Sequence, residues 1–70
     1  MEPTKHRARN LLTHMALGLA ETGHAHGEAL ANRGETDAAR QQLEEALSIF
    51  RRMGARAYIQ RTGRALAELQ

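Results

Sequence analysis

The chain has 70 residues, no cysteine and a formal net charge of +2, so it forms one domain at most and holds neither a disulfide nor a thiolate metal site. Only 41% of its residues are hydrophobic and 3% are aromatic, which leaves few large side chains for a core. A domain of this size with so small a core usually needs a staple or a partner. We therefore expect self-association, or docking on a larger protein, to supply additional burial.

The termini and the apolar runs bear on localisation. The first ten residues, MEPTKHRARN, lack the apolar run of a signal peptide. No later segment approaches the ~18 apolar residues of a membrane-spanning helix, and the lack of cysteine is compatible with a reducing compartment. These features predict a soluble, cytoplasmic protein with no membrane partner.

The first half of the chain predicts a helix that begins near Thr4. Polar residues at Thr22 and His26 interrupt its apolar spacing, so we expect a break or kink near Gly23 and a second, short helix over residues 24–33. A single bent helix over residues 4–33 is the alternative. The apolar stripe, with spacings of 4, 3 and 4, comprises Ala8, Leu12, Met15 and Leu19, with Leu11 beside it.

The clearest predicted element is a helix from about Thr36 to Met53. Gly34 breaks the chain before it, Thr36 or Asp37 can cap its first turn, and Gly54 can end it in the left-handed conformation. Its apolar residues recur with spacings of 4, 3, 4 and 3, which is typical of a helix with one buried face. They are Ala39, Leu43, Ala46, Phe50 and Met53, with Leu47 beside them.

A last helix is predicted from about Arg56 to Leu69, with the same spacing. Only one or two residues separate it from the central helix, so the two should pack antiparallel. No segment alternates as a strand does, and the fold class is therefore all-α, with three to four helices. The expected core consists of Leu43, Leu47, Phe50, Ile59, Leu66 and Leu69.

Residues 24–69 resemble a tetratricopeptide (TPR) repeat. Gly27 matches the small residue of that family's first helix, Gly34 matches its turn, and Ala39 and Ala46 match two small residues of its second helix. Leu30 and Leu43 take two large positions of the pattern, whereas Gly23 and His26 stand where the family has Trp and Leu, and Arg51 where it has a terminal proline. The resemblance is closest to the long-helix repeats of large bacterial transcriptional regulators and ATPases.

The resemblance implies an antiparallel helical hairpin or small bundle that serves as a scaffold for protein–protein contacts. A stable solenoid commonly needs about three repeats, so one repeat suggests a fragment, a capping piece or a small protein that assembles with copies of itself. We divide the single domain, residues 1–70, into an N-terminal helix over 1–22 and a TPR-like helix pair with a C-terminal helix over 24–69.

These features together predict a non-catalytic, self-associating protein–protein interaction module that belongs to, or associates with, a bacterial regulatory protein. We expect its contact face to consist of Leu11, Leu12, Met15 and Leu19, if these residues are not covered internally. No cofactor and no metal are expected, and the sequence offers no nucleophile–base pair. His24 and His26 are two residues apart and point away from each other on a helix, so we expect them to be exposed polar residues near the kink.

The alternative is a small basic nucleic-acid-binding protein. Charge is uneven along the chain, because residues 49–70 carry five basic residues against one acid, whereas residues 15–48 carry two against six. Arg52, Arg56 and Arg64 could contact phosphates. However, the central helix is too long, and the loop after it too short, for an ordinary helix-turn-helix. Arginines near a helix C-terminus are also favoured by the helix dipole alone.

Overall fold

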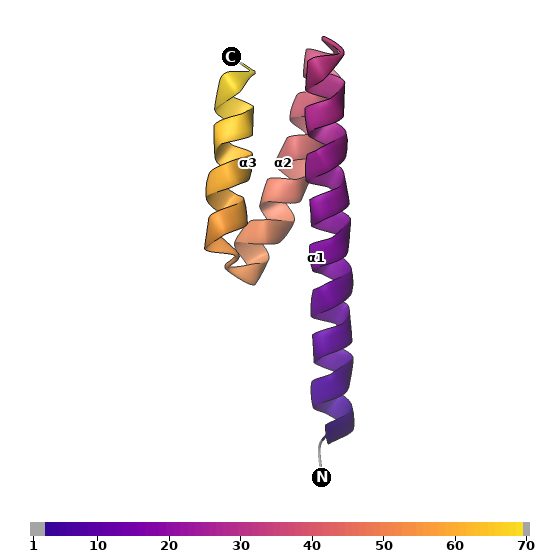
Figure 1. Ribbon diagram of the computed structural model, residues 1–70. Helices are drawn as coiled ribbons and strands as arrows, with labels where there is room; N and C mark the ends of the chain where they lie inside the picture. Colours follow the sequence, from indigo (N-terminus) through magenta and orange to yellow (C-terminus); the bar gives the residue numbers. More distant parts are fainter. Residues whose placement is uncertain (1–2, 70) are drawn as a thin grey trace.

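In the computed structural model, three helices follow one another in the order α1 (Pro3–Asn32), α2 (Thr36–Met53) and α3 (Arg56–Glu68). The structure describes the backbone of residues 3–69 and the side chains of residues 14–69. Two short turns reverse the chain, so α1 and α3 run in one direction and α2 in the other (Figure 1). The predicted all-α fold and the antiparallel packing of the last two helices are confirmed.

α1 is one continuous helix of 30 residues, so the predicted break near Gly23 is wrong and the alternative of a single helix is correct. α1 continues through residues 22–24, where we expected the N-terminal helix to end and the TPR-like helix pair to begin, because α2 lies against it there. A Cβ atom at Gly23 would lie 3.7 Å from the Cβ of Ala46. Packing against α2 thus offsets the ~1 kcal/mol that glycine costs in a helix. The polar residues that suggested a break, Thr22 and His26, are both exposed.

Two glycines in the left-handed region form the turns, as predicted. Gly34 has φ +82° and Gly54 has φ +68°. At the first turn, the N–H of Gly34 donates to the carbonyl of Ala31 (3.0 Å) and the N–H of Glu35 donates to that of Leu30 (2.9 Å). This pair of hydrogen bonds is the Schellman motif, which satisfies the last carbonyls of a helix, and the same pair recurs around Gly54.

α2 begins without a side-chain cap, so the capping role predicted for Thr36 or Asp37 is wrong. The residue before the helix is Glu35, whose carbonyl accepts the first helical hydrogen bond, from the N–H of Ala39 at 2.9 Å. Thr36 and Asp37 already lie inside the first turn, one and two residues past the capping position. The Asp37 carboxylate instead accepts a hydrogen bond from Arg40 at 3.4 Å.

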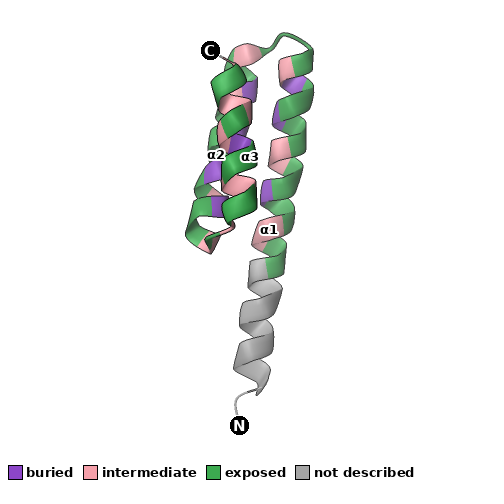
Figure 2. Ribbon diagram, turned by 60° about the vertical axis from the view of Figure 1, so that its left-hand side comes forward, coloured by how far each residue is buried: buried purple, intermediate pink, exposed green. Residues whose placement is uncertain are grey.

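The core lies along α2, with α1 and α3 on two sides of it (Figure 2). The buried residues of α2 are Ala39, Leu43, Ala46, Leu47 and Phe50. α1 adds Ala20 and Leu30, and α3 adds Thr62. The core positions predicted on α2 are therefore confirmed.

The predicted burial of three core residues on α3 is too high. Ile59, Leu66 and Leu69 are only partly buried. α3 packs along α2 and meets α1 through polar side chains, so its apolar stripe is covered on one side only. Leu66 borders a hollow shared with α2, and Leu69 borders a groove between α1 and α3. Because α3 is short, surface hollows remain beside its C-terminal end.

α1 extends well past the turn that joins α2 to α3 (Figure 1). At ~1.5 Å per residue, α1 is longer than α2 by about 18 Å, and the whole molecule measures 51 Å along its longest axis. This difference in length means that α2 can cover only the C-terminal part of α1.

Candidate protein-interaction surface

Two large apolar side chains of α1 are turned toward solvent. Met15 is 63% exposed and Leu19 is 68% exposed, and their spacing of four residues places them one turn apart on one side of the helix. They belong to the predicted contact face, and within this chain they remain uncovered, as that prediction requires. Its other two members, Leu11 and Leu12, lie outside the residues whose side chains the structure describes.

Small residues of α1 let α2 approach closely. Ala20 is 1% exposed and Gly27 is buried. A Cβ atom at Gly27 would lie 2.7 Å from the Cγ of Leu43 and 3.3 Å from the carbonyl oxygen of Ala39. The two helices therefore approach as closely as a glycine allows, and the packing side of α1 combines these small side chains with the buried Leu30.

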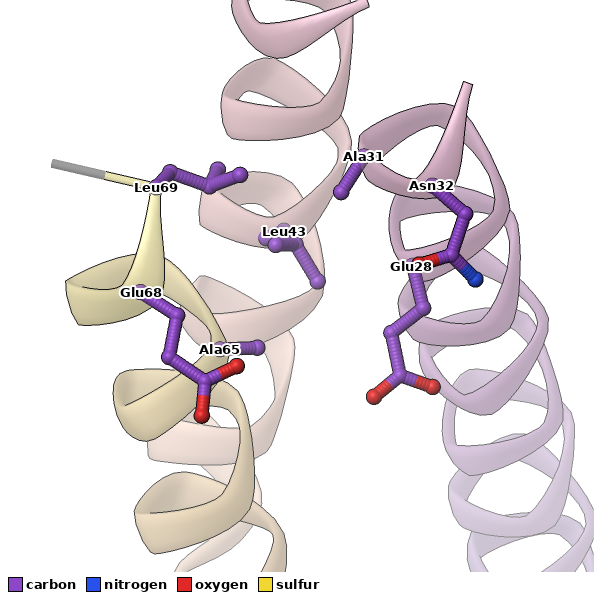
Figure 3. Close-up of a pocket in the computed structure, with 7 residues that line it drawn as sticks. All are labelled: Glu28, Ala31, Asn32, Leu43, Ala65, Glu68 and Leu69. Carbon is purple, nitrogen blue, oxygen red and sulfur yellow. The ribbon is translucent and has the colours of Figure 1, made fainter. Parts of the chain in front are cut away.

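A groove lies between the C-terminal ends of α1 and α3 (Figure 3). Leu43 of α2 lies between the two walls, and the volume is about 390 Å³. The lining residues are Glu28, Ala31, Asn32, Leu43, Ala65, Glu68 and Leu69. The groove thus combines an apolar floor with one carboxylate on each wall. It could not be found in the sequence, because its walls are more than thirty residues apart along the chain.

Polar side chains join α1 to α3 below this groove. The Nδ1 atom of His24 lies 3.0 Å from the hydroxyl of Thr62, and its Nε2 atom lies 3.3 Å from a carboxylate oxygen of Glu28. The expectation that His24 is exposed is wrong, because only 12% of its side chain is exposed. Thr62 of α3 is fully buried, and its hydroxyl needs a partner there. His24 provides that partner.

The order hydroxyl, imidazole and carboxylate is also the order of a catalytic triad, although the sequence suggested no nucleophile–base pair. A catalytic triad differs from a structural contact in that a substrate can reach its hydroxyl. Thr62 is 0% exposed, so its hydroxyl does not reach any surface where a substrate could bind. This set therefore serves to link two helices.

A second link between α1 and α3 runs through the tyrosine of the chain. The hydroxyl of Tyr58 donates to the carboxylate of Glu21, its ring stacks on Phe50 with centroids 4.7 Å apart, and the guanidinium of Arg61 lies 5.5 Å from the ring centroid. The hydrogen bond to Glu21, together with the charge of that carboxylate, raises the pKa of Tyr58 above its ordinary value of 10.0.

The structure distributes the three arginines of the nucleic-acid alternative over the surface. Arg52, Arg56 and Arg64 are all exposed. Arg52 lines a hollow between α2 and α3, whereas Arg64 lines a separate shallow hollow on α3 and Arg56 lines neither. The hollows lined by Arg52 and by Arg64 are thus separate ones.

Metal and membrane binding also have structural requirements. Within residues 14–69, no group of three or more histidine, aspartate or glutamate side chains is arranged to hold a metal ion. None of the described helices combines the length and the apolar character that crossing a membrane demands.

Comparisons of the chain with protein-family models, curated proteins and solved structures gave no match.

Proposed function

We propose that the chain is a non-catalytic, TPR-like helical module that associates with copies of itself through the exposed side of α1. The observation that carries the proposal is the exposure of Met15 and Leu19, at 63% and 68%, in a chain with a small core. Burying a leucine or methionine contributes ~1.5–3 kcal/mol. Pairing of this side of α1 with another helix would therefore add substantially to the stability of so small a domain.

The close contact of Gly27 with Leu43 supports the TPR-like part of the proposal, because the small residue of the first helix serves that purpose in the family. The resemblance of residues 24–69 to the long-helix repeats of bacterial regulators is the ground on which we propose a role within, or beside, a larger bacterial regulatory protein. The lack of cysteine favours the reducing environment of the cytoplasm as its location.

Sedimentation equilibrium over a range of micromolar concentrations tests the self-association. We expect a mass above the 7.8 kDa of one chain, and Leu19→Glu should raise the dissociation constant at least about tenfold, since it replaces a buried apolar contact by a charge. Ala25→Glu is the matched control, because Ala25 is exposed on the same helix and lies about a third of a turn away from Leu19.

Two outcomes would count against this proposal. The first is a cooperatively folded wild-type monomer at every concentration. The second is an equal loss of association in Leu19→Glu and Ala25→Glu, which would mean that added charge weakens association wherever it is placed.

A titration with duplex DNA at two salt concentrations tests the nucleic-acid alternative. Salt-dependent binding that is lost when Arg52, Arg56 and Arg64 are changed to glutamine would favour that alternative over self-association as the main function.

A further inference from the structure

The groove between α1 and α3 exists because the side chains that could fill it are small. One turn before the groove, the contact between His24 and Thr62, at 3.0 Å, closes the gap between the two helices. Farther along, the facing residues are Ala31 and Ala65, and Leu43 is left between them as the floor (Figure 3). The opening is therefore built into the packing of three helices, and its apolar contact area comes from Ala31, Ala65 and Leu69, which are partly buried, since Leu43 itself is only 1% exposed.

The charge of the groove is negative. Glu28 and Glu68 stand on its opposite walls, and no lysine or arginine lines it. α1 and α3 end at this end of the molecule, and α2 begins there (Figure 1), so the partly positive end of the α2 dipole offsets part of the negative ends of the other two. The two carboxylates, and not the dipoles, therefore favour a bound cation over an anion.

The two carboxylates differ in whether they already contact a neighbouring side chain. Glu28 already lies 3.3 Å from the Nε2 atom of His24, although 58% of its side chain is exposed. Glu68 is exposed and forms no ion pair with any residue whose side chain the structure describes. Glu68 is thus the carboxylate that is more available to a ligand, while Glu28 is a second carboxylate across the groove.

We propose that this groove binds a basic, apolar peptide segment of a partner protein. An arginine or lysine of that segment lies between Glu28 and Glu68, and a neighbouring apolar side chain rests on the partly buried Ala31, Ala65 and Leu69. The volume of about 390 Å³ is near the lower end of the ~300–1,000 Å³ of ordinary ligand sites. It suits a few side chains of an extended segment and is too small for a whole helix.

The probe is a blocked tripeptide, N-acetyl-Leu-Arg-Leu-amide, added to the isotope-labelled full chain while amide resonances are followed by NMR. The matched control is the same peptide with citrulline in place of arginine, which keeps the shape and removes the charge. We expect shifts at Ala31, Asn32, Ala65 and Leu69, and at least about tenfold weaker binding of the citrulline peptide, because charge-assisted hydrogen bonds are lost.

Two variants of the chain complete the test. Glu68→Gln should weaken binding of the arginine peptide about tenfold, and it does not threaten the fold, since it removes a negative charge from the C-terminal end of α3. Glu45→Gln is the control, because Glu45 is exposed on α2 and does not line the groove. Binding to Glu45→Gln should equal binding to the wild type.

Equal affinity for the two peptides, the absence of shifts at the groove, or an unchanged affinity in Glu68→Gln would each overturn this inference. Shifts at the groove that depend on chain concentration in the absence of peptide would overturn it in favour of a second copy of the chain as the occupant. Repeating the titration with Leu19→Glu keeps the result independent of the self-association proposed above.

Discussion

Replacement of Gly27 by alanine gives the sharpest test of how α1 and α2 pack. A Cβ atom added there would lie 2.7 and 2.8 Å from two carbon atoms of Leu43 and 3.3 Å from the carbonyl oxygen of Ala39. Both distances to Leu43 are shorter than real Cβ contacts, and Leu43 is itself only 1% exposed, so it has little room to move. Gly27→Ala must therefore shift Leu43 or separate the two helices.

The magnitude follows from two opposing terms. Alanine gains ~1 kcal/mol over glycine in a helix interior, whereas overpacking a core costs about 1–3 kcal/mol. We expect Gly27→Ala to destabilise the chain by about 1 kcal/mol net. Gly63 provides the matched control, because it lies inside α3 with nothing within 4 Å of an added Cβ. Gly63→Ala should stabilise the chain by ~0.5–1 kcal/mol, so the two substitutions differ in sign.

Urea unfolding followed by circular dichroism, at one fixed chain concentration, measures both changes. The double variant Gly27→Ala with Leu43→Ala isolates the contact, since in the Leu43→Ala background the added methyl group meets a cavity and should stabilise by ~1 kcal/mol. A Gly27→Ala chain that is as stable as Gly63→Ala would refute the close approach of α1 and α2.

Three further predictions concern polar contacts and a turn. Thr62→Val keeps the shape of the buried side chain but leaves the Nδ1 atom of His24 without its partner, so urea unfolding should show a loss of ~1–3 kcal/mol, with Thr62→Ser much closer to the wild type. The ultraviolet absorbance of Tyr58 should titrate above pH 10.0, and Glu21→Gln should lower that pKa toward its ordinary value. Because the folded pKa is raised, this contact stabilises the fold below the unfolded pKa and is lost as pH rises through the folded one. Gly54→Ala should destabilise the chain by ~1 kcal/mol, because φ is +68° there, again by urea unfolding.

The sequence specified α2 almost completely because its signals are local. Gly34 and Gly54 mark its ends, and the apolar spacing between them indicates which side is buried, so the buried positions Leu43, Leu47 and Phe50 could be predicted. The break near Gly23 was wrong because glycine and nearby polar residues favour a break only when nothing packs against them. Here Ala46 of α2 lies within 3.7 Å of the Cβ position, and this tertiary contact outweighs local propensity.

The candidate sites depended on information that spacing does not hold. The exposure of Met15 and Leu19 follows from the side of α1 that α2 covers, and that side includes small residues with weak hydrophobic signals, such as Ala20 and Gly27. The contact of His24 with Thr62 joins residues 38 positions apart. The groove bordered by Glu68 likewise depends on the relative placement of three helices.

The exposure of Leu19 on α1 leads to a last prediction, which concerns the midpoint of thermal unfolding and not the mass of the assembly. In a single chain, Leu19 is already 68% exposed, so Leu19→Glu removes little buried contact and should change the intrinsic free energy of unfolding by no more than ~0.5 kcal/mol. The wild type gains stability from association as concentration rises, and the variant does not. Thermal unfolding should therefore give nearly equal midpoints at low concentration and a higher midpoint for the wild type at high concentration. A midpoint difference that is the same at all concentrations would contradict this reasoning, because it would place the role of Leu19 inside one chain.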